Sequence, residues 1–568
     1  MITKKLAQTH IVDIPHALDE SIRENPEKTA LIYFGRKITY CELGRGVMQF
    51  SRLFEKLSGG QGKKYIALLM PNIPQFVMAY YGALRSENIA VPVNFASVAK
   101  KLKFGSPKTV GLEELEDVRA QISSCRPRII VIADLFWPIV EKIRSDFPYA
   151  SIVVVGIADL LPGYLKVLYP IKAYKEDKLV HIPREADISR FKVNVGDARE
   201  EYRAGDEDVP DEVAQLQYTG GSTGGPKAVM LSHRNVVSNA WQCREHLSFL
   251  GENEVVLGAL PFFHVYGLTV CLNITLLALR GTLVLMPVFS PKEALKLIKR
   301  YGVTLFPGIN RIFQSISDYA ELENLHSDHF MAVSGAGHLD KRIKAAFESR
   351  TGSVILNGYG LSEASPVLSV ELPGDHVEGS IGRPIPGTEI RIVSQETGED
   401  IASGSSEVGE IVARGPQVMQ GYLGNAEATA KAVRNGWLHT GDIGRLDQEG
   451  RLYIVDRADD MAKVSGEKVF SAHVEENILR CTDVLKCVVI FADDVKRGKA
   501  PIAFVVVREG ISGDDVARWS RSHMQSGLWL PREIISVSAE TFEGWEEITG
   551  KIKRKKIRDY YLQTHKAG

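Results

Sequence analysis

The chain has 568 residues, more than one hydrophobic core usually supports, so its length predicts at least two domains. Its 44% apolar and 24% charged residues are ordinary for a globular protein, and 69 basic against 70 acidic residues give a net charge of -1. That balance excludes the strong overall basic field of a nucleic-acid-binding protein, and we expect no nucleic-acid partner.

Cysteine spacing and apolar runs indicate the compartment. The six cysteines are scattered without a Cys-x-x-Cys pair, which predicts reduced thiols in a cytoplasmic protein. The N-terminus contains no apolar core of a signal peptide. The longest apolar run, Val265–Leu279, is shorter than the ~20 residues that span a bilayer. We interpret it as a buried core helix and expect no transmembrane segment.

The N-terminal third reads as alternating strands and helices. A short strand pair, Ala30–Phe34 and Lys37–Thr39, flanks Gly35-Arg36. An apolar strand, a periodic helix and a second strand then follow at the spacing of a parallel α/β unit. The predicted segments are the strands Lys64–Met70, Ile89–Val93, Ile129–Ala133 and Ser151–Gly156, and the helix Gln75–Arg85.

The segment Leu161–Lys175, LPGYLKVLYPIKAYK, alternates apolar and basic residues. Pro162 and Pro170 bracket it, so we expect any helix there to be short. Two interpretations stay open: a surface helix with basic edges, or peripheral contact with a membrane surface.

A glycine-rich stretch lies within Leu216–His233, LQYTGGSTGGPKAVMLSH. Glycines allow close approach of the backbone to a ligand, and hydroxyls with a lysine suit polyphosphate. It is not a Walker A loop, because Pro226 precedes the lysine and Ala228 follows it. We predict a phosphate-binding loop between two strands, Ala214–Tyr218 and Ala228–Leu231. The candidate ligand-binding residues are Thr219, Gly220, Gly221, Ser222, Thr223, Gly224 and Lys227.

The second half changes character twice. Strands and an amphipathic helix continue to about residue 380, after which many glycines and short strands predict a β-rich region. Beyond Asp456–Lys463 the pattern predicts a small α+β domain of ~110 residues. The segments expected there are the helix Ala472–Leu479 and the strands Cys487–Phe491 and Ile502–Val507.

Four further motifs accompany the glycine-rich stretch in a fixed order. They are NGYGLSEASP (Asn357–Pro366), GWLHTGDIG (Gly436–Gly444), YIVDRADDMAKVSGEKV (Tyr453–Val469) and TGKIKRKKIRD (Thr549–Asp559). Together they resemble the acyl-adenylate-forming, or AMP-binding, superfamily over nearly the whole chain. LQYTGGSTG and GPQVMQGYLG (Gly415–Gly424) look most like the long- and medium-chain fatty acyl-CoA synthetases.

The resemblance implies a fold and an activity. It implies a large N-terminal adenylation domain, residues 1–457, of α/β subdomains plus a β-rich subdomain. A small mobile α+β domain, residues 458–568, would carry the catalytic lysine. The implied reaction activates a fatty carboxylate with ATP and Mg²⁺ to acyl-AMP, then transfers the acyl group to coenzyme A.

The resemblance also assigns roles to single residues. Lys551 would bridge the carboxylate and the α-phosphate, Glu363 would bind Mg²⁺ with support from Thr223, and Lys227 would hold the β and γ phosphates. His264 resembles the gate beside the acyl carboxylate. The remaining implied nucleotide, coenzyme and hinge residues are Asn357 and Tyr359 at adenine, Ser362 beside them, Asp442 and Arg457 at ribose, Gly466 at the pantetheine tunnel, and Asp459 as hinge.

Each assignment has a structural alternative. Glu363 could be an N-terminal helix charge, Asp442 an Asx turn, Tyr359 core packing, and His264 a hydrogen-bonded core histidine. Lys551 lies in a basic run that a solvated tail would also show. For the whole chain, an acyl-adenylate ligase that loads an acyl carrier protein and a degenerate adenylate-binding or membrane-associated scaffold stay open. The sequence departs from the family pattern at Ala228, where glycine is usual, and at Ser471, where proline is common.

Overall fold

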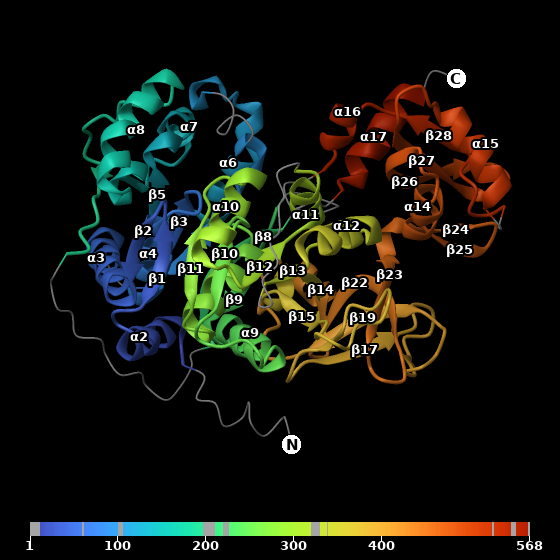
Figure 1. The fold of residues 1–568 in the computed structure, drawn as a ribbon, viewed down its shortest axis with the longest axis horizontal. Helices are drawn as coiled ribbons and strands as arrows, with labels where there is room; N and C mark the ends of the chain where they lie inside the picture. The colour runs from blue at the N-terminus through green and yellow to red at the C-terminus, as the bar shows by residue number, and fades with distance from the viewer. Residues whose placement is uncertain are drawn as a thin grey trace. The chain divides into compact units, whose positions relative to one another are not determined.

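The chain folds into two compact units in the computed structural model (Figure 1). Unit 1 comprises Met1–Asp375, Ile385–Thr388 and Arg414–Val433, and unit 2 comprises His376–Pro384, Glu389–Ala413 and Arg434–Gly568. The structure describes residues 12–59, 62–99, 106–196, 211–219, 226–319, 330–337, 339–524, 527–546 and 552–565. The predicted domain boundary at residues 457/458 falls inside unit 2 and stays a prediction.

The first sheet of unit 1 contains the strands around the glycine-rich stretch. Its described strands run in the order β20-β9-β8-β4-β3-β5-β6-β7, parallel from β8 to β7, with β9 and β20 antiparallel at one edge. The parallel strands β3, β4, β5 and β6 are mostly apolar, because helices and loops cover both faces of such sheets. Their bounds are β3 Tyr65–Leu69, β4 Ile89–Pro92, β5 Ile129–Ala133, β6 Ser151–Val155, β7 Ile188–Arg190, β8 Val213–Thr219, β9 Lys227–Ser232 and β20 Gly421–Tyr422.

The second sheet of unit 1 runs in the order β15-β14-β13-β12-β10-β11-β1-β2. It is parallel from β14 to β1, and β15 and β2 add antiparallel ends. The expected strand pair around Gly35-Arg36 is the β1–β2 hairpin. The bounds are β1 Thr29–Tyr33, β2 Arg36–Thr39, β10 Val255–Gly258, β11 Thr282–Leu285, β12 Leu305–Gly308, β13 Met331–Ser334, β14 Val354–Gly360 and β15 Val367–Val370.

Helices pack between and over these sheets, and two of them meet closely. α3 (Tyr40–Ser58) and α4 (Pro74–Arg85) touch where a Cβ on Gly82 would lie 2.6 Å from Phe50 Cβ, so only glycine fits there. The expected core helix is η6 (Tyr266–Ala278), buried along its whole length and wound as a π-helix. The other longer helices are α2 Ile14–Glu24, α3 Tyr40–Ser58, α4 Pro74–Arg85, α6 Glu116–Cys125, α9 His233–His246, α10 Pro291–Tyr301 and α12 Lys341–Thr351.

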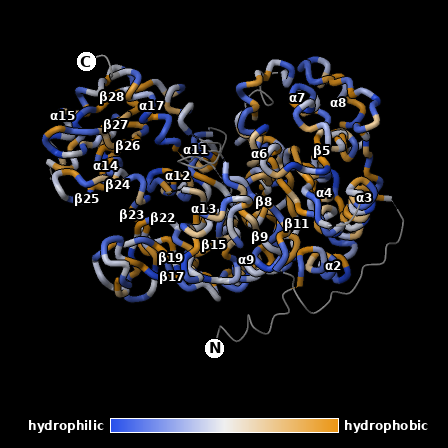
Figure 2. The backbone as a smooth tube through the Cα atoms, turned by 180° about the vertical axis from the view of Figure 1, so that it is seen from behind, coloured by the Kyte–Doolittle hydropathy of each residue, from blue (hydrophilic) through white to orange (hydrophobic). Residues whose placement is uncertain are grey.

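The segment after residue 160 forms a longer helix than expected. α8 (Gly163–Lys175) has 13 residues and continues through Pro170, so the prediction of a short helix is wrong. Proline removes one helical hydrogen bond, but packing of one helix face can offset that loss. The α8 backbone carries several hydrophobic segments (Figure 2). Among the described residues, no helix is both long and apolar enough to cross a bilayer.

Unit 2 begins with a mainly antiparallel sheet, as the glycine-rich β pattern predicts. Its order is β18-β17-β19-β22, with β23 paired to β22. The bounds are β17 Glu389–Val393, β18 Asp400–Ile401, β19 Gly409–Arg414, β22 Trp437–Leu446 and β23 Leu452–Arg457.

The rest of unit 2 is the predicted α+β element. A sheet in the order β26-β27-β28 has α14 and α15 against one apolar cluster, through Val474 and Val516, and α17 against another, through Ile557. The hairpin β24–β25 precedes it. The bounds are β24 Met461–Val464, β25 Glu467–Phe470, α14 Ser471–Leu479, β26 Val484–Asp494, β27 Gly498–Val507, α15 Gly513–His523, β28 Glu533–Ser536, α16 Ala539–Glu543 and α17 Arg554–His565.

Candidate active site

The glycine-rich segment joins the two strands of a β-hairpin. β8 and β9 pair antiparallel with Thr219 opposite Lys227, so the lysine stands at the base of the connecting loop. The flanking strands are confirmed. The loop residues Gly220, Gly221, Ser222, Thr223 and Gly224 lie outside the described residues, and their phosphate contacts stay predictions.

Tyr422 connects Lys227 to Glu363. The Lys227 ammonium lies 5.1 Å from the centre of the Tyr422 ring, within cation–π range. The Tyr422 hydroxyl donates to Glu363 Oε1 at 2.7 Å. Two of the predicted site residues, from segments 136 positions apart, therefore meet on one aromatic side chain that no sequence motif indicates.

Backbone pairing holds these three side chains together. The Tyr422 strand, β20, is antiparallel to β9, with Tyr422 opposite Val229. Glu363 lies in the 3₁₀ turn η7 (Ser362–Ala364), and its carbonyl accepts from the Met419 N–H at 2.8 Å. The Ser365 hydroxyl donates to the Gln417 carbonyl at 2.9 Å. The segment that carries Tyr422 is thus fixed to both the hairpin and the Glu363 turn.

The strand β14 carries the residues expected at adenine. Asn357 Nδ2 donates to Glu371 Oε2 at 2.9 Å, and the Asn357 backbone N–H donates to the same oxygen at 2.7 Å. Because the amide nitrogen of Asn357 donates to Glu371, its amide oxygen is the atom that can accept a hydrogen bond from an amino group. Tyr359 is 8% exposed, and Ser362 is half-buried at the start of η7.

His264 lies in the turn before η6. Its Nδ1 accepts from the Tyr266 N–H at 3.2 Å, which places the ring proton on Nε2 when the imidazole is neutral. The Tyr266 hydroxyl in turn donates to the Val333 carbonyl at 2.8 Å. The histidine is half-buried and anchored by this contact, and its role beside an acyl carboxylate stays a prediction.

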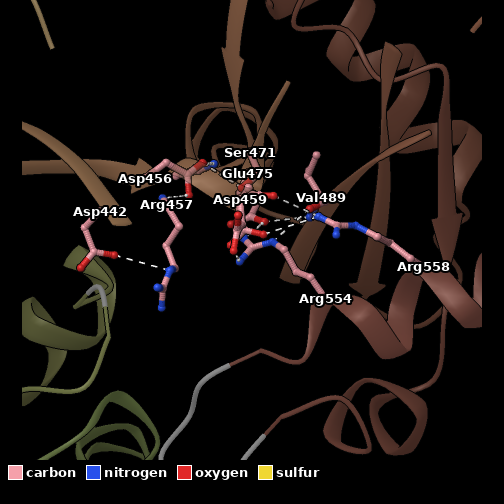
Figure 3. A network of polar contacts seen from close by, with 11 residues as sticks. Asp442, Asp456, Arg457, Asp459, Ser471, Glu475, Val489, Arg554 and Arg558 are labelled. Atoms are coloured by element: carbon pink, nitrogen blue, oxygen red, sulfur yellow. Dashed lines mark hydrogen bonds and ion pairs between the residues drawn. The ribbon is translucent and has the colours of Figure 1, made fainter. Parts of the chain in front are cut away.

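In unit 2, the β-hairpin β22–β23 places Asp442 beside Arg457. The two residues are register partners, and Arg457 Nε lies 3.5 Å from Asp442 Oδ1 (Figure 3). Asp442 belongs to a strand, and its N–H donates to Thr440 Oγ1 at 3.1 Å. A carboxylate that is mostly buried beside a half-exposed guanidinium can accept from vicinal hydroxyls while the arginine donates nearby.

Asp456 connects this hairpin to the following helix. Its Oδ2 accepts from the Ser471 hydroxyl and from the Ala472 N–H, both at 2.9 Å (Figure 3). Burial raises the pKa of the Asp456 carboxyl, and these donors act in the opposite direction. Ser471, which stands where the family commonly has proline, therefore supplies a hydrogen bond at the start of α14.

Arg554, at the start of α17, binds two carboxylates of the preceding elements. Its guanidinium lies 3.0 Å from Asp460 Oδ2 and 2.7 Å from Glu475 Oε1, and its Nε donates to the Val489 carbonyl. Arg558, one turn later, donates to the carbonyl of Asp459 at 3.2 Å (Figure 3). The predicted hinge residue Asp459 is therefore held through its backbone to α17. Lys551 lies outside the described residues, and its role stays a prediction.

Gly466 occupies the turn between β24 and β25. Ser465 and Gly466 have φ of 52° and 89°, and a two-residue hairpin turn with both φ values positive favours glycine there. This geometry accounts for the glycine, and a contact with pantetheine stays a prediction.

The Glu363 carboxylate fits a magnesium-nucleotide complex. In the described part of the chain, no three His, Cys, Asp or Glu side chains gather into a metal-binding group. Mg²⁺ with nucleotide phosphates needs one or two protein carboxylates and keeps several waters. The half-buried Glu363 carboxylate, oriented by Tyr422, suits that requirement.

Solved structures share this fold. The ATP-bound MatB from Rhodopseudomonas palustris superposes with a TM-score of 0.78 at 23% identity, covering 97% of this chain and 99% of that one. The anthranilate CoA ligase AuaEII with anthranoyl-AMP gives the same TM-score and identity and covers 98% of both chains. The chain therefore has the fold of acyl- and aryl-CoA ligases.

The family is shown by sequence. The model of the AMP-binding enzyme family matches residues 18–423, and that of the AMP-binding enzyme C-terminal domain matches residues 473–541. The chain belongs to the AMP-binding enzyme family. It is 33% identical to the long-chain-fatty-acid–CoA ligase of Bacillus subtilis (strain 168) over 97% of both chains. It is 29% identical to the enzyme of that name from Escherichia coli O157:H7, over 95% of this chain and 93% of the other.

Proposed function

We propose that this chain is an ATP-dependent fatty acyl-CoA synthetase, an acid–thiol ligase that forms AMP. The observation that carries the proposal is the joining of Lys227 and Glu363 through Tyr422 beside the glycine-rich loop. Lysine and a carboxylate for Mg²⁺ are the two groups that a triphosphate needs at one place. The full-length similarity to long-chain-fatty-acid–CoA ligases supports a fatty carboxylate as substrate.

In the first half-reaction, a carboxylate oxygen attacks the α-phosphorus of ATP and pyrophosphate leaves. Lys227 would neutralise the departing phosphates, and Glu363 would hold the Mg²⁺, which would supply further positive charge there. Tyr422 keeps Glu363 from swinging towards Lys227, because it binds the carboxylate and presents its ring to the ammonium. On this proposal Lys551 bridges the attacking carboxylate and the α-phosphate.

Other groups bind the nucleoside. Asn357 accepts from the adenine amino group, Tyr359 packs on the base, and Asp442 accepts from the ribose hydroxyls with Arg457 as donor. In the second half-reaction, the coenzyme A thiolate attacks the acyl carbonyl and AMP leaves. Between the two half-reactions, movement at the hinge Asp459 would take Lys551 away from the acyl-adenylate. The same movement would bring in the strand around Gly466, which would line the pantetheine tunnel.

The compartment belongs to the proposal too. All six cysteines are free thiols in the structure, and four of them are buried. Free thiols suit a reducing compartment, which supports a cytoplasmic location.

The proposal is tested by exchange of labelled pyrophosphate into ATP with a series of fatty acids. We expect exchange that needs both Mg²⁺ and a fatty acid but no coenzyme A, because adenylation precedes thiol attack. Absence of exchange at every chain length would contradict adenylation. Product formation with an acyl carrier protein but never with coenzyme A would favour the carrier-loading alternative.

A further inference from the structure

The outward face of α8 is apolar, the reverse of an ordinary surface helix. Five large side chains at helical spacing point outward, each more than half exposed: Tyr164 66%, Val167 73%, Leu168 54%, Ile171 57% and Tyr174 76%. We call these five residues the α8 stripe. A surface helix normally turns polar residues to solvent, and single exposed apolar residues are scattered. A continuous stripe indicates a face that contacts something apolar.

The opposite face of α8 already has its partner within unit 1. Ala173 is buried, and Leu165 and Tyr169 are half-buried on the same side. Burial raises the pKa of the Tyr169 hydroxyl, with the Asp134 carboxylate acting in the same direction. The helix is thus held in place by its inner face, and the α8 stripe is not needed for that packing. α8 lies next to α7 (Trp137–Ile143) in both views (Figures 1 and 2).

The charge on α8 is positive. The helix contains three lysines, at positions 166, 172 and 175, and no acidic residue. The acidic residues that follow it are paired within the chain: Asp177 with Lys108 at 2.6 Å, and Glu176 with Lys178 at 2.8 Å. The near-neutral net charge of the whole chain therefore conceals a local excess of positive charge beside the α8 stripe.

We propose that the α8 stripe docks on the surface of an anionic lipid bilayer, with the helix lying in the interface plane. The aliphatic residues Val167, Leu168 and Ile171 occupy the centre of the stripe, where they would enter the acyl boundary. Tyr164 and Tyr174 stand at its two ends, and tyrosine favours the headgroup level. Lysine stems can cover apolar surface while their ammonium groups reach lipid phosphates.

A bilayer explains this composition better than a protein partner. The cores of protein interfaces are depleted of lysine, whereas interfacial membrane helices are enriched in it. The docking itself does not depend on the catalytic activity. Its benefit rests on the proposed function, since a fatty acid partitions into membranes and a docked enzyme would meet it there.

The test is flotation of the full-length protein with vesicles on a density gradient. One set of vesicles contains equal parts phosphatidylglycerol and phosphatidylcholine, and the other contains phosphatidylcholine alone. We expect the wild type to float with the anionic vesicles, more weakly in high salt, and hardly at all with the neutral ones. In the double variant Val167→Asp, Ile171→Asp, the bound-to-free ratio should fall about tenfold or more, because two apolar side chains that would enter the bilayer become charged.

A matched control places the same charges on exposed apolar residues elsewhere. Leu485→Asp, Val495→Asp changes side chains that are 49% and 106% exposed in unit 2, and it should float like the wild type. The milder Val167→Ser, Ile171→Ser serves if the aspartates disturb folding, which thermal melting reports.

Two results would overturn the docking proposal: a wild type that floats with neither kind of vesicle, or a folded stripe variant that floats as well as the wild type. Loss of self-association in the stripe variant without any vesicle binding would instead identify a second copy as the partner. Flotation needs no turnover, so failure of the proposed enzyme activity would leave this result unaffected.

Discussion

Removing the Arg554 guanidinium should destabilise unit 2 strongly. Arg554 has an exposed side-chain fraction of 18%, and its partners Asp460 and Glu475 have 12% and 18%. The carboxylates raise the pKa of Arg554 despite its burial, and burial raises the pKa of Glu475. In Arg554→Met, Glu475 would lose its counter-charge in a mostly buried setting, and Asp460 would keep the weaker pairing with Arg558 at 3.7 Å.

The magnitude follows from these contacts. Breaking a fully buried ion pair costs about 3–5 kcal/mol, and partial exposure reduces this, so we expect about 2–4 kcal/mol. For a unit of this size, that lowers the melting temperature by roughly 5–15 °C. Differential scanning calorimetry of the full chain should show the shift in one transition, since unit 1 is unchanged.

A neighbour and a second partner provide controls. Lys555→Met removes a charge from an exposed side chain next to Arg554 and should change stability by no more than ~0.5 kcal/mol. Glu475→Gln in the Arg554→Met background should recover part of the loss, because it removes the charge of one of the two carboxylates that paired with Arg554. Equal melting of Arg554→Met and the wild type would refute the assignment of this network as a stabilising link.

Four further outcomes are expected. Tyr422→Phe keeps the ring beside Lys227 but frees Glu363, and should lower kcat/KM in pyrophosphate exchange about tenfold; an unchanged value would exclude the positioning role. Asp442→Asn should raise the KM for ATP roughly 10–100-fold through weaker ribose binding, measured by initial rates, and an unaltered KM would contradict that contact. Lys551→Ala should lower adenylation about 100–1000-fold yet largely spare thioester formation from supplied acyl-adenylate; loss of neither step would remove its assigned role. Burial lowers the pKa of His233 to about 4, below its unfolded value of 6.5. The unfolded chain then binds the extra proton, so stability should fall by up to about 3 kcal/mol as pH drops from 6.5 to 4. Denaturant unfolding of His233→Asn should lack this component, whereas the exposed His181→Asn should retain it.

Much of the fold could be predicted because local patterns and the final structure agree. The apolar strands of the first sheet, the β1–β2 hairpin and the glycine-loop strands follow from short apolar or alternating runs bounded by turn residues. The same holds for α14, β26 and β27 in unit 2. These elements bury their apolar residues as their patterns require, so tertiary packing reinforces local preference.

α8 shows where local rules failed. Pro162 and Pro170 predicted a short helix, but packing of the inner face carries the helix through Pro170. The π winding of η6 was also not foreseen, because a buried apolar run gives the same pattern for either winding. Backbone hydrogen-bond spacing is set by the surrounding core.

The site residues also fall into two groups: those that sequence motifs indicate and those that only the structure reveals. Lys227, Glu363, Asp442 and Arg457 could be selected from motifs, because their residue types and order match the chemistry. The motifs do not point to Tyr422, although in GPQVMQGYLG (Gly415–Gly424) it is the only residue with an aromatic hydroxyl. Its partners are distant in sequence, and only strand pairing brings them together. Asp456 and Arg554 were missed for the same reason, since their value lies in contacts that spacing does not reveal.

The central claim, that this AMP-binding enzyme joins a fatty carboxylate to coenzyme A, is tested most directly by measuring the products of one reaction. Purified protein with ATP, Mg²⁺, coenzyme A and a fatty acid should yield acyl-CoA, AMP and pyrophosphate in equal amounts, resolved by chromatography and mass spectrometry. Omitting coenzyme A should leave enzyme-bound acyl-AMP. Formation of ADP and phosphate, or of no acyl-CoA with any fatty acid, would contradict the account.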